Sequence, residues 1–171
     1  IQNLQSVVSR NVSPKETLVI TVATFNSGKA NNVIPDDATI SGTIRYYNKE
    51  VGVLAKKRFE TIVNNTCSLF GAKPEINLIP GYPPTVNHKA NSEFAFEVAK
   101  KVVGLKASPK QSPMMGSEDF SYFLEKIPGA FAWIGNGKSA PLHNPKYDFN
   151  DSVLTIGSSF FATLVEEKLN T

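Results

Sequence analysis

The side chains best suited to chemistry stand in two short segments in the second half of this chain. Residues 141–145 read Pro-Leu-His-Asn-Pro, a loop sequence that holds His143, and Asp148 and Asp151 follow shortly after it. A histidine held in such a loop can ligate a metal or act as a general base. A solvent-exposed loop histidine is the plainer interpretation, and the spacing alone favours it.

The second segment, residues 115–120, reads Met-Gly-Ser-Glu-Asp-Phe and pairs the carboxylates of Glu118 and Asp119. Acidic residues stabilise the first turn of a helix, and that structural role explains both of them. Arg45 belongs to a stretch rich in hydroxyl side chains, where its guanidinium could bind a carboxylate through two hydrogen bonds. An ordinary surface role is the default interpretation of Arg45, and of His88 as well.

Composition excludes several classes of protein. The 171 residues include one cysteine and two histidines, so neither a disulfide framework nor a cysteine-rich zinc fold is expected. No apolar run approaches the roughly 20 residues that cross a bilayer. The net charge is only +3, and the densest basic run, Lys56-Lys57-Arg58, fits the solvated face of a helix. We therefore expect neither nucleic acid nor a membrane as a partner.

The first half of the chain predicts an antiparallel sheet with helices on one face. Apolar residues at helical spacing begin at Ile1 with no capping residue before them, so we expect the natural protein to extend further upstream. Residues 38–46 alternate like a half-buried strand, whereas residues 18–25 are apolar enough for at least partial cover on both faces. The predicted elements are a helix at 1–8, strands at 18–25 and 38–46, a helix at 49–70 capped by Gly71, and a strand at 75–79. A later helix is predicted to end at Gly104. The buried stripe predicted for the helix at 49–70 consists of Ala55, Phe59, Ile62, Val63, Thr66 and Phe70.

That order falls one strand short of the ferredoxin-like βαββαβ pattern, so the fold class is α/β of the α+β type. The irregular segment 81–87 predicts a domain boundary. Beyond it, a strand predicted at 130–134 has no partner in sequence, which missing sequence explains better than an α-rich domain with a further strand near 108–115. Helices are predicted to start at Asn91 or Ser92, at Ser117, and at Asp151 or Ser152.

Five segments of the chain form an ordered set. They are residues 4–11 (Leu-Gln-Ser-Val-Val-Ser-Arg-Asn), 32–45 (Asn-Val-Ile-Pro-Asp to Gly-Thr-Ile-Arg), 81–87 (Gly-Tyr-Pro-Pro-Thr-Val-Asn), 115–120 and 141–145. In this order they resemble the M20 metallopeptidases, above all the amidohydrolase branch with hippurate hydrolases, N-acyl-amino-acid hydrolases and auxin-conjugate hydrolases. Each segment alone is a weak signal, but the set spans nearly the whole chain.

The resemblance implies a fold and a division into domains. M20 enzymes carry a metal-binding catalytic domain that is interrupted by an inserted lid, which is also the dimerisation domain. Residues 1–82 would then be most of a ferredoxin-like lid that lacks its first strand. Residues 83–171 would be the C-terminal segment of an α/β, zinc-peptidase-like catalytic domain, and the chain the C-terminal portion of a longer enzyme.

By the same resemblance, family members use one or two divalent ions, zinc or manganese, to activate water against an amide. His143 corresponds to the last metal ligand, and Asn32 and Arg45 correspond to lid residues that bind substrate, often across a dimer interface. Glu118 falls in a motif near the active centre, where we expect a supporting role. The general base has no counterpart here, so we expect it upstream, with no metal bound and no activity in this chain alone.

The implied substrates are N-acyl amino acids or dipeptide-like molecules. We expect a cytoplasmic enzyme that forms a homodimer through the lid. The alternative is a non-enzymatic dimerisation or ligand-binding module derived from the lid. Exposed apolar surface on residues 83–171 would favour the enzyme, because a self-contained module would cover its own core. The resemblance assigns no role to His88.

Overall fold

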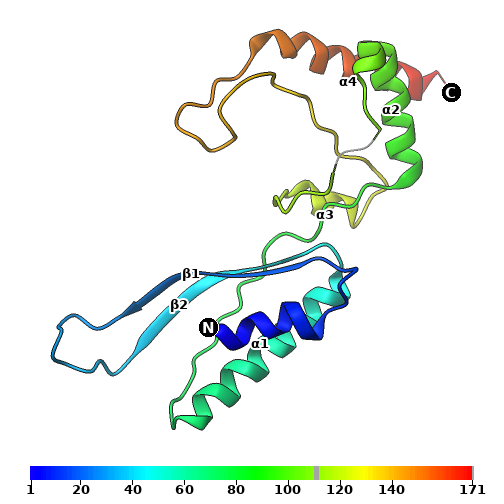
Figure 1. The fold of residues 1–171 in the computed structure, drawn as a ribbon. Helices are drawn as coiled ribbons and strands as arrows, with labels where there is room; N and C mark the ends of the chain where they lie inside the picture. The colour runs from blue at the N-terminus through cyan, green and yellow to red at the C-terminus, as the bar shows by residue number, and fades with distance from the viewer. Residues whose placement is uncertain (110–111, 171) are drawn as a thin grey trace. The chain divides into compact units, whose positions relative to one another are not determined.

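The computed structural model describes residues 1–109 and 112–170, which form two compact units. One unit comprises residues 1–84 together with 115–117, and the other comprises residues 85–114 together with the chain from Glu118 onward. Figure 1 shows the course of the chain. Helices are combined with a small antiparallel sheet, which agrees with the predicted α+β class.

The first unit begins with short helical turns that supply part of its core. Gln2–Leu4 form a 3-10 turn and Val7–Asn11 form a π-helical turn. Leu4 and Val7 are 2% and 0% exposed, as their helical spacing predicts, whereas Ile1 is 56% exposed. The predicted opening helix is therefore confirmed in outline, with its apolar face toward the sheet and α1.

Strands β1 (Leu18–Ser27) and β2 (Ala38–Tyr46) form an antiparallel hairpin. The register pairs Leu18 with Tyr46 at the base of the hairpin, and it shifts once, midway along β1. Both predicted strands are thus confirmed. The loop that joins them lies at the far end of the hairpin (Figure 1).

The hairpin is buried only at its base and only on one face. Leu18 and Ile20 are each 6% exposed and belong to the core cluster. The partial cover predicted for both faces of residues 18–25 is limited on the opposite face, where Val19 is 38% exposed, and it is slight near the loop, where Phe25 is 63% exposed. The hairpin extends beyond the helix that covers its base (Figure 1), so its outer half has no covering layer in this unit.

Helix α1 (Lys49–Leu69) packs its apolar stripe against this core. Asn48 caps the helix by accepting a hydrogen bond from Glu50 N at 2.9 Å, and Gly71 follows its end with φ +67°. The predicted stripe is confirmed at Ala55, Phe59, Ile62 and Val63. Phe70 is wrongly included in it, since the helix ends before this residue and its side chain is 79% exposed.

Two predicted strands are not formed. Residues 75–79 and 130–134 are not strands, and within the described residues the sheet consists of β1 and β2. A strand exists through hydrogen bonds to a neighbouring strand, and the described part of the chain places none beside either segment. The alternative strand near 108–115 falls partly on residues 110–111, outside the described residues, and its described part holds no strand.

The second unit is built from helices α2 (Lys89–Val103), α3 (Phe120–Leu124) and α4 (Leu154–Leu169). Helices α2 and α4 pack against each other, and Val98 of α2 is 1% exposed. Gly104 ends α2 with φ +59°, as predicted. None of the helices in the described ranges is both long and apolar enough to cross a membrane.

Two helical segments of this unit start earlier than predicted. Helix α2 begins directly after His88, and not at Asn91 or Ser92. A 3-10 turn precedes α4, and Asn150 caps it by accepting a hydrogen bond from Ser152 N at 3.1 Å. Helix α2 starts directly after His88 without a side-chain cap, so no capping signal marks its start. Asn150, Asp151 and Ser152 are all good caps by type, so the sequence alone does not decide which one is used.

The packing of Gly52 in α1 leads to a prediction. A Cβ atom at Gly52 would lie 2.3 Å from the ring of Tyr46. Alanine is normally better than glycine in a helix by about 1 kcal/mol. We predict the opposite sign here: Gly52→Ala lowers the free energy of unfolding by about 1–3 kcal/mol, because the Tyr46 ring must leave its place in the core. Urea denaturation measures the change.

Asn65→Ala on the same helix is the matched control, since Asn65 is exposed and gains helix propensity without a clash. It should leave the free energy of unfolding unchanged or slightly higher. A Gly52→Ala protein as stable as this control would contradict the close packing of α1 on Tyr46.

Candidate functional site

His143 lies near the tip of a loop in the second unit. Asn144 N donates a hydrogen bond to Pro141 O at 3.1 Å, which closes a tight turn with His143 at its third position. His143 has φ +67°, and no other non-glycine residue in the described ranges has a positive φ. Such a backbone costs about 1 kcal/mol or more and is most frequent at functional sites. The side chain is exposed, so a ligand can reach the imidazole.

The side chains of Asn136 and Ser139 tie the two ends of this loop together. Asn136 Nδ2 donates to Asp148 O at 2.7 Å, and Asn136 Oδ1 accepts from Asn150 N at 2.7 Å. Ser139 Oγ donates to Asp148 O at 3.0 Å and accepts from Asp148 N at 3.1 Å. A polar network therefore closes the base of the loop that carries His143.

Glu118 lies half-buried at the start of α3. Its Oε1 accepts a hydrogen bond from Phe120 N at 3.3 Å, and its backbone oxygen accepts one from the hydroxyl of the buried Ser121 at 2.6 Å. The prediction of a helix that opens at Ser117 with two acids in its first turn is wrong: α3 begins at Phe120, and its first turn holds no acidic residue. Glu118 instead accepts the bond from Phe120 N from just before the helix. This local contact accounts for Glu118 by itself, and the supporting role near an active centre stays a prediction.

Arg45 is exposed on β2, on the face of the hairpin that points away from the core. It pairs with Val19, and Thr43 and Thr21 form the next pair on the same face. Arg45 Nη1 donates a hydrogen bond to Met115 O. A guanidinium has five N–H donors, so this bond leaves Arg45 able to bind a carboxylate as well.

Asn32 lies in the exposed loop between β1 and β2, at the other end of the hairpin from Arg45. Strand β2 spans the seven residue steps from Ala38 to Arg45, about 24 Å at the usual rise per residue. A small N-acyl amino acid is much shorter than this. Asn32 and Arg45 of one copy are therefore too far apart to bind the same small substrate.

Direct contacts do not join the predicted site residues within either unit. Among the residues that the structure describes, no hydrogen bond or ion pair joins Asn32 to Arg45 in the first unit or Glu118 to His143 in the second. Residues 1–109 and 112–170 contain no group of three or more His, Cys, Asp or Glu side chains that could hold a metal ion. His143 is a suitable single ligand, but a zinc site needs three or four, so these residues alone do not fit the implied metal.

The structure gives His88 and its neighbour Asn87 a role that the sequence does not indicate. His88 Nδ1 accepts a hydrogen bond from Gly129 N at 3.1 Å, and Asn87 bonds both backbone groups of Phe131. Asn136, whose side chain closes the base of the His143 loop, is a further residue that the sequence does not single out. The available signal is weak: Asn136 stands between two glycines, and Asn87 and His88 end an irregular segment that begins at Gly81, where side chains often bond backbone groups.

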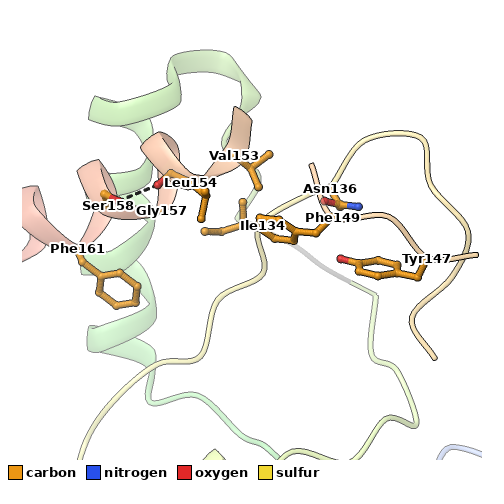
Figure 2. A pocket seen from close by; sticks show the side chains of 9 residues that line it. All are labelled: Ile134, Asn136, Tyr147, Phe149, Val153, Leu154, Gly157, Ser158 and Phe161. Atoms are coloured by element: carbon orange, nitrogen blue, oxygen red, sulfur yellow. Dashed lines mark hydrogen bonds between the residues drawn. The ribbon is translucent and has the colours of Figure 1, made fainter. Parts of the chain in front are cut away.

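An apolar cavity of about 310 Å³ lies between α4 and the loop that carries His143 (Figure 2). Most of its lining is aliphatic or aromatic, and the hydroxyl of Ser158 is engaged with Leu154 O at 2.8 Å. The lining of this cavity is suited to contact with apolar groups and not to recognition of a polar ligand. Six of the lining residues are Ile134, Tyr147, Phe149, Val153, Leu154 and Phe161.

A comparison with protein families identifies the family of this chain. Residues 6–167 match the model of peptidase family M20/M25/M40. The match covers far more than half of the chain, and the chain therefore belongs to this family. The resemblance in the five ordered segments is thereby confirmed.

Individual relatives agree with this assignment. The chain is 36% identical over 178 residues to the IAA-amino acid hydrolase ILR1-like 4 of Arabidopsis thaliana, covering 99% of this chain and 40% of that protein. It is 37% identical to a hippurate hydrolase of Campylobacter jejuni, covering 94% of this chain and 42% of the relative.

A solved structure from Bacillus subtilis, a dinuclear metal-binding peptidase of family M20, superposes with a TM-score of 0.77 and 29% identity. The alignment covers 100% of this chain and 46% of that one. The chain thus spans less than half the length of each of these relatives, and it has the fold of the matched part of an M20 peptidase.

The turn at His143 leads to a second prediction. Glycine adopts a positive φ without strain, so His143→Gly should leave the free energy of unfolding unchanged or raise it by up to about 1 kcal/mol. Leu142→Gly in the same turn is the control, because Leu142 has no positive φ and glycine there only adds freedom to the unfolded chain. It should cost about 0.5–1 kcal/mol. Thermal or urea unfolding measures the free energy of unfolding of both variants. Equal losses of this free energy in the two variants would contradict backbone strain at His143.

Proposed function

We propose that the protein at its full natural length hydrolyses the amide bond of N-acyl amino acids or similar dipeptide-like molecules. Family membership over residues 6–167 carries this proposal. Relatives named hydrolases of IAA-amino acids and of hippurate, and a deacetylase of N-acetylcysteine, support the substrate class. Each of these names describes an acyl group joined to an amino acid through an amide.

His143 is the residue of this chain that we place at the metal. Its imidazole is exposed, and the positive φ of its backbone marks a position where the fold accepts strain. The turn and the closed base of the loop restrict the directions in which the ring points. A bound zinc or manganese ion would supply an activated water for attack on the amide. The remaining ligands and the general base belong, in our proposal, to the part of the protein that matches the rest of its relatives.

Arg45 and Asn32 are the residues that we place at the substrate. The carboxylate of an N-acyl amino acid matches the planar donors of Arg45, and the surrounding threonine hydroxyls keep this face polar. Asn32 lies in the loop beyond Ala38, and Ala38 itself is about 24 Å along β2 from Arg45. A site that uses both residues therefore takes them from two copies of the chain. Glu118 keeps the start of α3 in place through its bond from Phe120 N, and the supporting role that we propose for it rests on the family motif.

Exposed apolar side chains in the second unit favour this interpretation over a self-contained module. Four large examples are Phe123, Ile127, Trp133 and Phe161, which are 60%, 62%, 56% and 65% exposed. Large apolar surface of this kind is typical of faces that contact further protein. Since the relatives are more than twice as long as their matched part, we propose that residues 1–171 alone do not turn over substrate.

The outer half of the hairpin is the surface through which we propose a homodimer forms. Phe25, Val33 and Ile34 are 63%, 62% and 94% exposed there. The free edges of the two strands can add backbone hydrogen bonds to this apolar contact. A cytoplasmic location is part of the same proposal, and the unpaired Cys67 is compatible with a reducing compartment.

The function is tested by release of free amino acid from N-acetyl and N-benzoyl amino acids, with Zn²⁺ or Mn²⁺ added to the full-length protein. We expect turnover that falls at least 100-fold in His143→Ala because a ligand is lost. Arg45→Ala should raise KM for these substrates more than it lowers kcat. An unaltered protein without turnover on any of them would contradict the proposed activity. Robust turnover by residues 1–171 alone would contradict the proposed inactivity of this part.

The dimer is tested by light scattering after size exclusion. We expect twice the protomer mass for the unaltered protein and a shift toward the protomer for Ile34→Glu, because a charge placed in an apolar interface is costly to desolvate. Val53→Glu, at a residue of α1 that is 70% exposed and lies away from the hairpin loop, should stay dimeric. A monomeric unaltered protein would contradict the proposal.

A further inference from the structure

Gly129 and Phe131 obtain their backbone hydrogen bonds from two consecutive residues, Asn87 and His88, through three side-chain bonds and one backbone bond. Asn87 Oδ1 accepts from Phe131 N at 2.7 Å, and Asn87 Nδ2 donates to Phe131 O at 2.8 Å. His88 Nδ1 accepts from Gly129 N at 3.1 Å, and His88 N donates to Gly129 O at 3.0 Å. Both backbone groups of each of the two residues are thereby paired.

These contacts reproduce what a neighbouring strand would provide. In an extended segment, residues two apart present their N–H and C=O groups at the same edge, and Gly129 and Phe131 are spaced in this way. The side-chain amide of Asn87 matches a backbone amide, since it carries one donor and one acceptor side by side. The acceptor role of His88 Nδ1 requires the neutral ring with its proton on Nε2. We call residues 87–88 the clamp.

The clamp is connected to the segment that contains Glu118 through aromatic rings. The ring of Phe131 lies 5.9 Å from that of Phe120 and makes an edge-to-face contact with Trp133 at 5.3 Å. Phe120 is the first residue of α3, and its backbone N–H donates to Glu118 Oε1. A shift of Phe131 would therefore move the residue that holds the Glu118 carboxylate.

The clamp is connected to His143 along the chain. Five residues after Phe131, Asn136 provides both hydrogen bonds that join the start of the loop to Asp148 and Asn150. The position of Phe131 thus sets where the base of the loop begins. The two segments that we place in the active site both depend on one clamped segment between them.

We propose that Asn87 and His88 are positioning residues, which act on Glu118 through Phe131 and Phe120 and on His143 through the base of its loop. This proposal rests on the proposed function for its effect on turnover. The proposed effect on the positions of Glu118 and His143 rests only on the contacts described above. It assigns a role to His88 that is neither metal binding nor acid–base catalysis.

The test compares variants that change single atoms of the clamp in the full-length protein. Asn87→Asp keeps the shape and the acceptor but places a carboxylate oxygen against Phe131 O. His88→Ala removes the acceptor for Gly129 N, whereas His88→Asn keeps an oxygen acceptor at nearly the same place. Asn77→Asp, at an exposed residue of the other unit, adds the same charge without touching the clamp.

Amide hydrogen exchange resolved by residue is the first measurement. We expect exchange at Gly129 and Phe131 to become at least tenfold faster in Asn87→Asp and His88→Ala, and exchange at Phe120 and Asn150 to become faster with it. His88→Asn and Asn77→Asp should resemble the unaltered protein. Faster exchange confined to Gly129 and Phe131, or none at all, would overturn the positioning role.

Steady-state kinetics on an N-acyl amino acid is the second measurement. We expect kcat to fall about tenfold in Asn87→Asp and His88→Ala with KM changed less than twofold, and His88→Asn to recover most of the loss. Loss of activity in proportion to the fraction of unfolded protein, with kcat per folded molecule unchanged, would overturn the proposal. Absence of turnover in the unaltered protein would contradict the proposed function alone, because the exchange pattern decides the clamp separately.

Discussion

Much of this structure depends on one constraint, which is that every backbone N–H and C=O removed from water needs a hydrogen-bond partner. Strands β1 and β2 satisfy it by pairing with each other, and α1 satisfies it internally with Asn48 and Gly71 at its ends. The second unit has extended segments but no strand pairs within the described residues. In that unit the side-chain amides of Asn87 and Asn136 make the backbone hydrogen bonds that a neighbouring strand would make. The segments that carry Glu118 and His143 extend from the residues bonded in this way.

The sequence predicts elements well where the pattern is local. Alternation identifies β2, apolar spacing identifies α1, and Gly71 and Gly104 mark helix ends because glycine adopts a positive φ at low cost. The sequence does not predict elements that depend on contacts with residues distant along the chain. Residues 130–134 have the composition of a strand, but a strand requires a neighbour, which composition does not encode. The bonds from Asn87 join residues 44 apart in sequence, which no local rule detects.

The site shows the same division. The motif order was sufficient to identify the family, and it selected His143, whose positive φ is an independent structural sign of a constrained position. The roles of Asn32, Arg45 and Glu118 came from resemblance, and the geometry adds information that a motif lacks. The length of the hairpin separates Asn32 from Arg45, and the N–H of Phe120 engages the carboxylate of Glu118. A motif records which residues occur, whereas distance determines which of them can act on one molecule.

The reliance on a side-chain amide also has a chemical consequence. Asparagine side chains are among the groups that heat damages first. Hydrolysis of the Asn87 amide would leave an acid of the same shape, with an acceptor where Phe131 O requires a donor. One such event, without any break in the chain, would leave two acceptors facing each other at a segment that supports both ends of the proposed site. Hydrolysis of the Asn87 amide would therefore disturb the segments of Glu118 and His143, which Asn87 does not contact.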